Sequence, residues 1–209
     1  MILFAGDSFS FYDEDDGWPN FLAKKFDMPF HNLSLGGSSI WYSYERLIQP
    51  KISELILKNK ISYLILTCTN KDRIPFCECP EKSSLKPDIT KDTNLLDDDF
   101  SNFVYYNKFY SVNLHSFLYK EILSRLIMTY GKNTKIVLLS CFGDSVKFFK
   151  EIYNYNQDFL YCETPLMKFY KKVTENTICK NHMSVQDNQK IADILYEKIN
   201  LINSGSFKL

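Results

Sequence analysis

The sequence has no excess of charge of either sign. Its 209 residues include 25 Lys plus Arg and 25 Asp plus Glu, so the formal net charge is zero. A neutral chain has no overall electrostatic attraction to nucleic acid or to an anionic membrane surface. We therefore expect neither of these partners.

Long apolar runs are also absent. The longest, near residues 63–66 and 136–139, fall far short of the roughly 20 residues that a membrane-spanning helix needs. The first residues, Met-Ile-Leu-Phe-Ala-Gly-Asp, lack the basic stretch, the apolar core and the small-residue cleavage site of a secretion signal. We therefore expect no membrane association and a cytoplasmic location.

Regularly spaced cysteines are lacking too. The six cysteines lie at irregular spacings, and without a secretion signal we expect reduced thiols rather than a disulfide framework. Cys77 and Cys79 form a C-x-C pair, but zinc sites usually combine two such pairs or add histidines, and no second pair lies nearby. The sequence predicts neither a metal site nor a cofactor.

What is present is an alternation of apolar runs and helical patterns. Five short apolar runs predict strands, at residues 2–5, 29–33, 61–67, 136–140 and 159–162. The segments with apolar side chains at helical spacing lie between and after them, at residues 19–26, 40–56, 109–130 and 188–199, with shorter ones at 147–153 and 166–173. Pro50 is expected to kink or divide the second helix. This order predicts an α/β fold, a three-layer α/β/α sandwich with a flavodoxin-like, mostly parallel five-stranded sheet.

One segment interrupts this alternation. Residues 71–103 lack periodicity, carry three prolines and include the acidic run Asp97-Asp98-Asp99, which is typical of a long loop. The strand pattern resumes after it, and 209 residues suit one core. We therefore predict a single domain over residues 1–209 with a lid-like insertion at about 71–103.

Small polar residues follow three of the predicted strands. Ser8 follows the first strand, Gly37 lies in the loop after the second, and Asn70 follows the third. In an open parallel sheet, ligands bind outside the carboxyl ends of the strands, so these residues are expected at one edge. A hydroxyl, a flexible backbone donor and an amide are groups that acyl transfer uses, together with a base.

The chain offers three histidines as that base. His182 lies in a polar loop before the last predicted helix, from which it could return to the same edge of the sheet. His31 enters a strand and His115 lies beside apolar helix positions, so we interpret both as structural. His182 is the candidate base.

In order and spacing, these four stretches resemble the four blocks of the SGNH, or GDSL-like, hydrolase family, over nearly the whole chain. The resemblance implies that Ser8 is the nucleophile and His182 its base. It also implies an oxyanion hole made by the backbone N–H groups of Ser8 and Gly37 and the side-chain amide of Asn70.

The sequence departs from the family pattern at two places. Cys179 stands three residues before the histidine, where the family commonly has aspartate, and Thr69 and Lys71 replace the usual glycine and aspartate of the third block. A thiol is a poor substitute for the carboxylate that orients the histidine ring. Glu175, Asp187 or a backbone carbonyl is the alternative orienting group.

The resemblance implies a serine ester hydrolase that removes a small acyl group from a small-molecule or carbohydrate ester, for example an O-acetyl group. Trp41 and Tyr42, just after the glycine loop, are candidates to line the substrate cleft. An alternative is a catalytically silent SGNH-like module that binds a glycan or another ligand, which Cys179 favours.

A third hypothesis is a phosphate or nucleotide binder at the helix N-terminus after Ser8. Neither G-x-G-x-x-G nor a Walker loop occurs, and Asp7 would repel phosphate. The sequence therefore favours the two SGNH-like readings.

Overall fold

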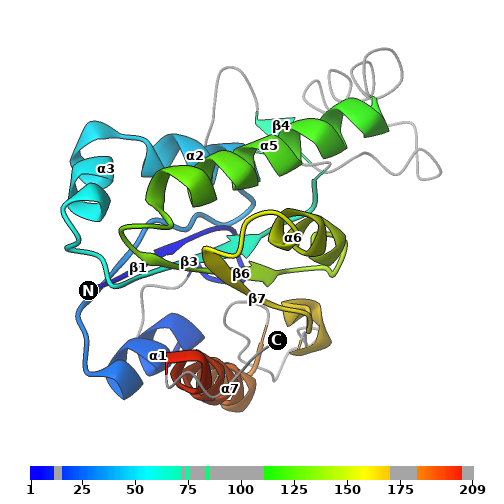
Figure 1. Ribbon diagram of the computed structural model, residues 1–209. Coiled ribbons are helices and arrows are strands. Elements are labelled where there is room, and N and C mark those ends of the chain that lie inside the picture. The colour runs from blue at the N-terminus through cyan, green and yellow to red at the C-terminus, as the bar shows by residue number, and fades with distance from the viewer. Residues whose placement is uncertain (12–15, 72–73, 76–82, 85–110, 170–182, 204–209) are drawn as a thin grey trace.

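The computed structural model describes residues 1–11, 16–71, 74–75, 83–84, 111–169 and 183–203 (Figure 1). Most of the predicted insertion lies outside these residues. Its described part includes two short strands, β4 (Ile74–Pro75) and β5 (Ser83–Ser84), which pair antiparallel. The single domain and its lid-like insertion stay predictions.

The core of the fold is a five-stranded parallel sheet. Its strands are β1 (Ile2–Ala5), β2 (Phe30–Asn32), β3 (Tyr63–Cys68), β6 (Lys135–Ser140) and β7 (Phe159–Cys162). They lie in the order β2-β1-β3-β6-β7, and every neighbouring pair is parallel. This is the flavodoxin-like order, so the predicted fold class is confirmed.

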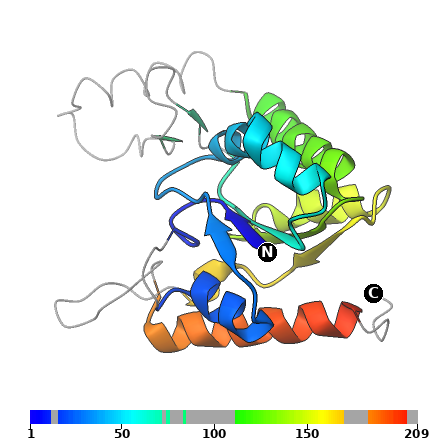
Figure 2. The ribbon, with the colours of Figure 1, turned by 90° about the vertical axis from the view of Figure 1, so that its left-hand side faces the viewer.

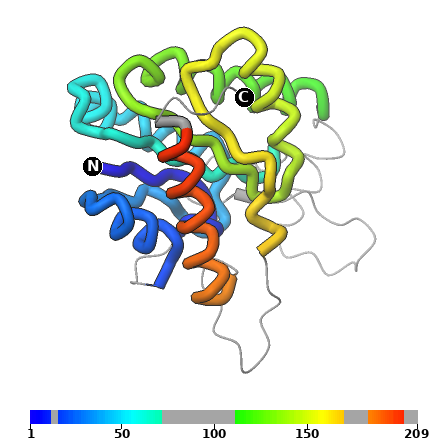
Figure 3. The backbone as a smooth tube through the Cα atoms, turned by 60° about the horizontal axis from the view of Figure 1, so that its bottom comes forward, coloured from blue at the N-terminus to red at the C-terminus, as the bar shows by residue number. Residues whose placement is uncertain are grey.

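Helices cover both faces of the sheet, as Figures 1 and 2 show. On one face lie α2 (Ile40–Leu47), α3 (Pro50–Leu57), α5 (Val112–Tyr130) and α6 (Val146–Tyr153). On the other lie α1 (Trp18–Phe26) and α7 (Val185–Asn203), side by side in Figures 2 and 3. The molecule is thus a three-layer sandwich.

A hydrophobic core lies on each face of the sheet, and alternate residues of a strand pack into one core or the other. Leu3 and Ala5 of β1 pack in the cluster with α2, α3, α5 and α6, whereas Ile2 and Phe4 pack in the cluster with α1 and α7. Successive side chains of a strand point to opposite faces, and both faces are covered here. This is why the strand reads as an unbroken apolar run.

Local sequence signals account for several helix boundaries. Pro50 begins α3 and so divides the predicted long helix in two. Ser111 caps α5 by accepting a hydrogen bond from the Leu114 N–H at 3.3 Å. The helix predicted for residues 166–173 is described only as a 3₁₀ turn, Leu166–Phe169, because residues 170–173 lie outside the described part.

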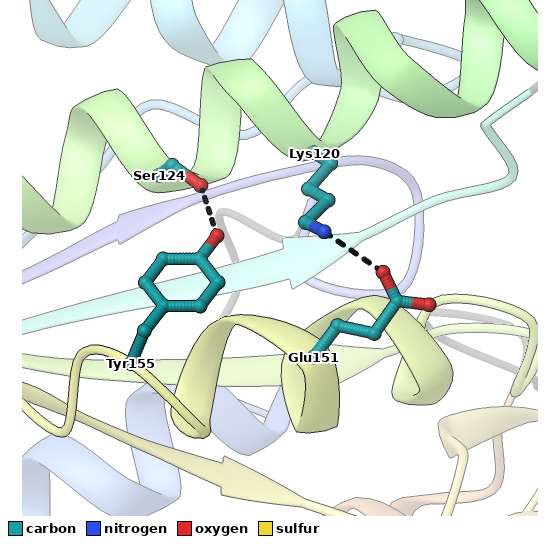
Figure 4. A network of polar contacts seen from close by, with 4 residues as sticks. All are labelled: Lys120, Ser124, Glu151 and Tyr155. Carbon is teal, nitrogen blue, oxygen red and sulfur yellow. Dashed lines mark hydrogen bonds and ion pairs between the residues drawn. The ribbon is translucent and has the colours of Figure 1, made fainter.

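Two polar contacts join α5 to α6 and to the turn that follows α6 (Figure 4). The Lys120 ammonium lies 2.9 Å from the Glu151 carboxylate, and the Ser124 hydroxyl lies 3.1 Å from the Tyr155 hydroxyl. The hydrogen bond that Lys120 donates to Glu151 raises the pKa of Lys120. The two contacts connect the middle of α5 to α6 and to Tyr155, which follows α6.

Among the helices described, none combines the length and the apolar character that crossing a bilayer would demand.

Candidate active site

The three residues predicted at strand ends do lie at one edge of the sheet. Ser8 is in the loop after β1, Gly37 is in the loop between β2 and α2, and Asn70 is the second residue after β3. Because β2, β1 and β3 are parallel neighbours, all three loops leave the same edge. Each of the three residues is partly exposed at the surface.

The loop that carries Ser8 is a tight turn built around Asp7. The Asp7 carbonyl accepts the N–H groups of Ser10 at 3.0 Å and Phe11 at 2.9 Å. Its buried carboxylate accepts the Phe9 N–H at 3.1 Å and the Cys141 thiol at 3.2 Å. A short side chain that accepts an N–H two residues later stabilises such a turn. The contacts support a structural role for Asp7.

Gly6 joins the first two loops. Its carbonyl accepts the Leu35 N–H at 3.0 Å and the Ser38 hydroxyl at 2.9 Å, so the loop that contains Gly37 is bonded to the end of β1. Gly6 has φ +149, and an added Cβ would lie 1.7 Å from the Thr67 hydroxyl oxygen. The close contact with β3 therefore requires glycine.

Three buried hydroxyl groups connect the ends of all three strands beneath Gly6. The Ser10 hydroxyl lies 2.8 Å from that of Ser34 and 2.6 Å from that of Thr67. The Asn32 amide donates to the Ser10 carbonyl at 2.8 Å. Sequence analysis missed Ser10, Ser34 and Thr67, because no spacing distinguishes them from ordinary hydroxyl residues at strand ends.

Gly37 has a backbone conformation that favours glycine. Its φ is +78, and an added Cβ would meet no described atom within 4 Å. The positive φ therefore favours glycine at position 37, and crowding by other described atoms does not contribute.

The backbone just before Asn70 is held by two buried side chains that sequence analysis did not single out. The Tyr119 hydroxyl of α5 donates to the Thr69 carbonyl at 2.8 Å. The Ser145 hydroxyl lies 2.8 Å from the Tyr119 oxygen and 3.4 Å from the same carbonyl. Burial raises the pKa of Tyr119 well above its ordinary value, which keeps its hydroxyl a donor.

The start of α7 is connected to the Ser8 loop through two buried side chains. The Trp18 ring N–H donates to the Phe9 carbonyl at 2.6 Å, and the Trp18 backbone N–H donates to the Asn188 side chain at 2.9 Å. Asn188 in turn donates to the carbonyl of Ser184 at 3.1 Å. Residues 183–184 are thereby linked to the Ser8 loop, and Met183 is fully buried.

His182, Cys179 and Glu175 lie outside the described residues. The other candidate for orienting the histidine, Asp187, lies in the first turn of α7. Its carboxylate accepts the Ser184 hydroxyl at 2.5 Å, and its own N–H donates back to that hydroxyl at 3.2 Å. This reciprocal pair caps α7. Whether Asp187 also orients His182 stays a prediction.

Trp41 and Tyr42 occupy the first turn of α2. Tyr42 is buried, and the Arg46 guanidinium lies 4.9 Å from the centre of its ring. Trp41 is only partly buried, against the core on that face. Their proposed role in a substrate cleft stays a prediction.

An apolar groove of about 350 Å³ lies elsewhere, between β7 and the second half of α7, lined by Leu160, Cys162 and Ile194 among others. The part of α7 that lines this groove is the end away from the Ser8 loop.

Within the described residues, no three His, Cys, Asp or Glu side chains gather to hold a metal ion, and Cys77 and Cys79 lie outside that part.

No protein-family model and no curated protein matches this sequence. Solved structures do resemble its fold. An acetyl xylan esterase from the rumen bacterium Butyrivibrio proteoclasticus aligns over 99% of this chain with a TM-score of 0.53 and 15% identity. A family two carbohydrate esterase from Clostridium thermocellum, in complex with cellohexaose, aligns over 99% with a TM-score of 0.52 and 12% identity.

A member of the lipolytic G-D-S-L family from Veillonella parvula aligns over 94% of this chain and 97% of its own, with a TM-score of 0.50 and 10% identity. The chain covers only 64% of the acetyl xylan esterase and 65% of the Clostridium esterase. At these identities the likeness shows the fold alone, which this chain shares with esterases and G-D-S-L lipolytic proteins of known structure.

Proposed function

We propose, starting from this SGNH-type fold, that the chain is a serine ester hydrolase that removes a small acyl group from a carbohydrate ester, with Ser8 as nucleophile and His182 as base. One observation carries the proposal. A partly exposed serine, a glycine with positive φ and an asparagine follow three neighbouring parallel strands, and buried hydrogen bonds through Gly6 and Ser10 join the three loops.

In the proposed reaction, the Ser8 oxygen attacks the ester carbonyl carbon while His182 accepts the serine proton. The tetrahedral intermediate then collapses, the C–O bond to the alcohol breaks, and His182 returns the proton to the leaving alcohol. A water molecule, deprotonated by His182, hydrolyses the acyl-serine and releases the carboxylic acid.

The proposed oxyanion hole consists of the backbone N–H groups of Ser8 and Gly37 and the side-chain amide of Asn70. Donors fixed before the reaction stabilise the charge that develops on the carbonyl oxygen, and losing one costs about 3 kcal/mol, or roughly 10²-fold or more in kcat. Support comes from the rigid loops, because the hydrogen bonds around Gly6 and Thr69 limit reorganisation.

Support for His182 comes from the described residue next to it. Met183 is fully buried in the same cluster as Phe9, and Asn188 and Trp18 link residues 183–184 to the Phe9 carbonyl. His182 thus directly precedes residues that hydrogen bonds connect to the Ser8 loop. A base within hydrogen-bond reach of Ser8 is the geometry that acyl transfer requires.

The test measures hydrolysis of p-nitrophenyl acetate and release of acetate from acetylated xylan oligosaccharides. We expect wild type to turn over at least one substrate and to react with a fluorophosphonate probe. Ser8→Ala and His182→Ala should each lower kcat by at least about 10³-fold, since triad members act as a unit. His31→Ala, which removes an exposed histidine, is the matched control and should keep wild-type turnover.

Asp187→Asn tests the orienting group. If Asp187 orients the ring, the variant should lose up to about 10⁴-fold in kcat, and Glu175→Gln should lose little. The reverse pattern would assign the role to Glu175. Wild type that neither hydrolyses these esters nor reacts with the probe would rule out the hydrolase.

The alternative is a catalytically silent module that binds a glycan in the same place. Cys179 favours it, because the family commonly has aspartate at that position. The Clostridium esterase was solved in complex with cellohexaose, which makes a cello-oligosaccharide a suitable probe. Calorimetric binding of cellohexaose that is lost in Trp41→Ala, without Ser8-dependent turnover, would support this alternative.

A further inference from the structure

We propose that Tyr119 and Ser145 are positioning residues that fix the direction of the Asn70 amide from behind the site. The inference rests on the proposed function and deepens it, because Asn70 is the proposed side-chain donor to the oxyanion. Neither residue has a place in the four blocks on which the resemblance rests.

The peptide unit between Thr69 and Asn70 connects the two supporting hydroxyls to the Asn70 backbone. The Thr69 carbonyl and the Asn70 N–H belong to one planar group, so fixing the carbonyl oxygen fixes the plane from which Asn70 extends. The Tyr119 hydroxyl donates to that oxygen at 2.8 Å, and the Ser145 oxygen lies 3.4 Å from it. Thr69 itself is buried, so water does not compete for these bonds.

The donors are held rigidly in turn. Tyr119 and Ser145 are 1% and 0% exposed, their oxygens lie 2.8 Å apart, and the Tyr119 ring packs against Phe148 with ring centres 5.4 Å apart. On the outer side of the same helices, the Lys120 to Glu151 ion pair holds α5 to α6 one residue along from Tyr119 (Figure 4).

The Ser145 hydroxyl points to the backbone before Asn70 and not to the start of α6. Ser145 precedes α6 with a helical backbone, φ −73 and ψ −22, and its side chain makes no capping bond. Its hydroxyl contacts Tyr119 and Thr69 instead. These side-chain contacts therefore support the backbone behind Asn70 and not the helix terminus.

The experiment compares two tyrosines of one helix. Tyr119→Phe removes the hydroxyl that holds Thr69. Tyr130→Phe is the matched control, because Tyr130 is also on α5, is also 1% exposed, and also bonds a carbonyl, that of Leu47 at 3.1 Å, and a serine, Ser53 at 3.0 Å. Its partners belong to α2 and α3, away from Asn70.

We expect Tyr119→Phe to lower kcat roughly tenfold with little change in KM. The loss should be smaller than the roughly 10²-fold or greater loss in kcat on removing an oxyanion donor, because the Asn70 amide stays present but is held less well. Tyr130→Phe should leave kcat within about twofold of wild type. In an Asn70→Ala background the effect of Tyr119→Phe should vanish, because no amide is left to position. Ser145→Ala should show the same dependence on Asn70.

Equal kcat values for the two tyrosine variants, or an undiminished effect of Tyr119→Phe in the Asn70→Ala background, would overturn the inference while leaving the hydrolase intact. A wild type without Ser8-dependent turnover is a separate outcome that removes the proposed function.

Amide hydrogen exchange then decides whether Tyr119 holds this backbone. Residues 67–71 should exchange faster in Tyr119→Phe than in Tyr130→Phe, and equal rates would contradict it.

Discussion

Both the backbone conformation of Gly6 and the atoms around it exclude a larger side chain at this position. Its carbonyl accepts two hydrogen bonds from the loop after β2, and its Cα faces the Thr67 hydroxyl at the end of β3. A single glycine thus fixes how closely three strand ends approach one another. Ser8 follows two residues later, so its position depends on this contact.

Gly6→Ala is expected to destabilise the protein severely, by roughly 3–5 kcal/mol, because overpacking adds to backbone strain at φ +149. Urea unfolding measures the loss. Gly36→Ala is the control, since its Cβ would meet Phe11 at an ordinary 3.6 Å. A Gly6→Ala protein with the wild-type free energy of unfolding would refute the packing argument.

Sequence could point to Ser8, Gly37 and Asn70 because each lies in the segment that follows an apolar run, where ligand sites of parallel sheets lie. It could not point to their supports. Ser10 and Thr67 are 57 positions apart, and Tyr119 and Thr69 are 50 positions apart. A single sequence carries no sign of such pairings, which exist only once the strands are in register.

At the scale of elements, the contact between α1 and α7 depends on Asn188. This fully buried amide accepts from the Trp18 N–H and donates to the Ser184 carbonyl. Around it, Lys25 forms an ion pair with Asp193 at 2.6 Å. The exposed ion pair adds little by comparison, since surface pairs contribute at most about 1 kcal/mol.

Asn188→Ala should lower the free energy of unfolding by about 1–3 kcal/mol, because it leaves the buried Trp18 N–H without its acceptor and removes the side-chain donor to the Ser184 carbonyl. Chemical denaturation followed by circular dichroism checks this. Gln189→Ala, at the exposed neighbouring position, should change stability by no more than about 0.5 kcal/mol. Similar losses in both variants would argue against a special role for Asn188.

The elements themselves were largely predictable. Strands buried on both faces give unbroken apolar runs, so β1 and β7 were predicted with the bounds observed. The start of α7 was predicted three residues late, because its first turn is fixed by the polar pair Ser184 and Asp187 rather than by an apolar position. Two-residue strands such as β4 are too short to leave a pattern.

At the scale of the whole molecule, two buried acids make stability depend on pH. Burial raises the pKa of the Cys68 thiol above its ordinary 9.0 and that of the Tyr119 hydroxyl above its ordinary 10.0. Above those values the unfolded chain releases protons that the folded protein keeps. The folded state then binds more protons, so the free energy of unfolding falls as pH rises.

We therefore expect stability to be full below about pH 8 and to decline from about pH 9 upward, by as much as about 1.4 kcal/mol per pH unit for each group. Urea unfolding between pH 7 and 10.5 measures the slope. Tyr119→Phe and Cys68→Ala should each show a shallower decline than wild type. A decline of the same slope in both variants would mean that other groups cause it.

The cluster of Ser10, Ser34 and Thr67 hydroxyls connects the strands whose loops carry Ser8, Gly37 and Asn70. Its contacts link the edge strand β2, through Ser34, to the loop after β1 and to β3. Each contact joins two different strands or their loops, so none of them can form within one loop. The arrangement of these three loops is accordingly a property of the assembled sheet, and local opening of any one of the three strands would disperse it.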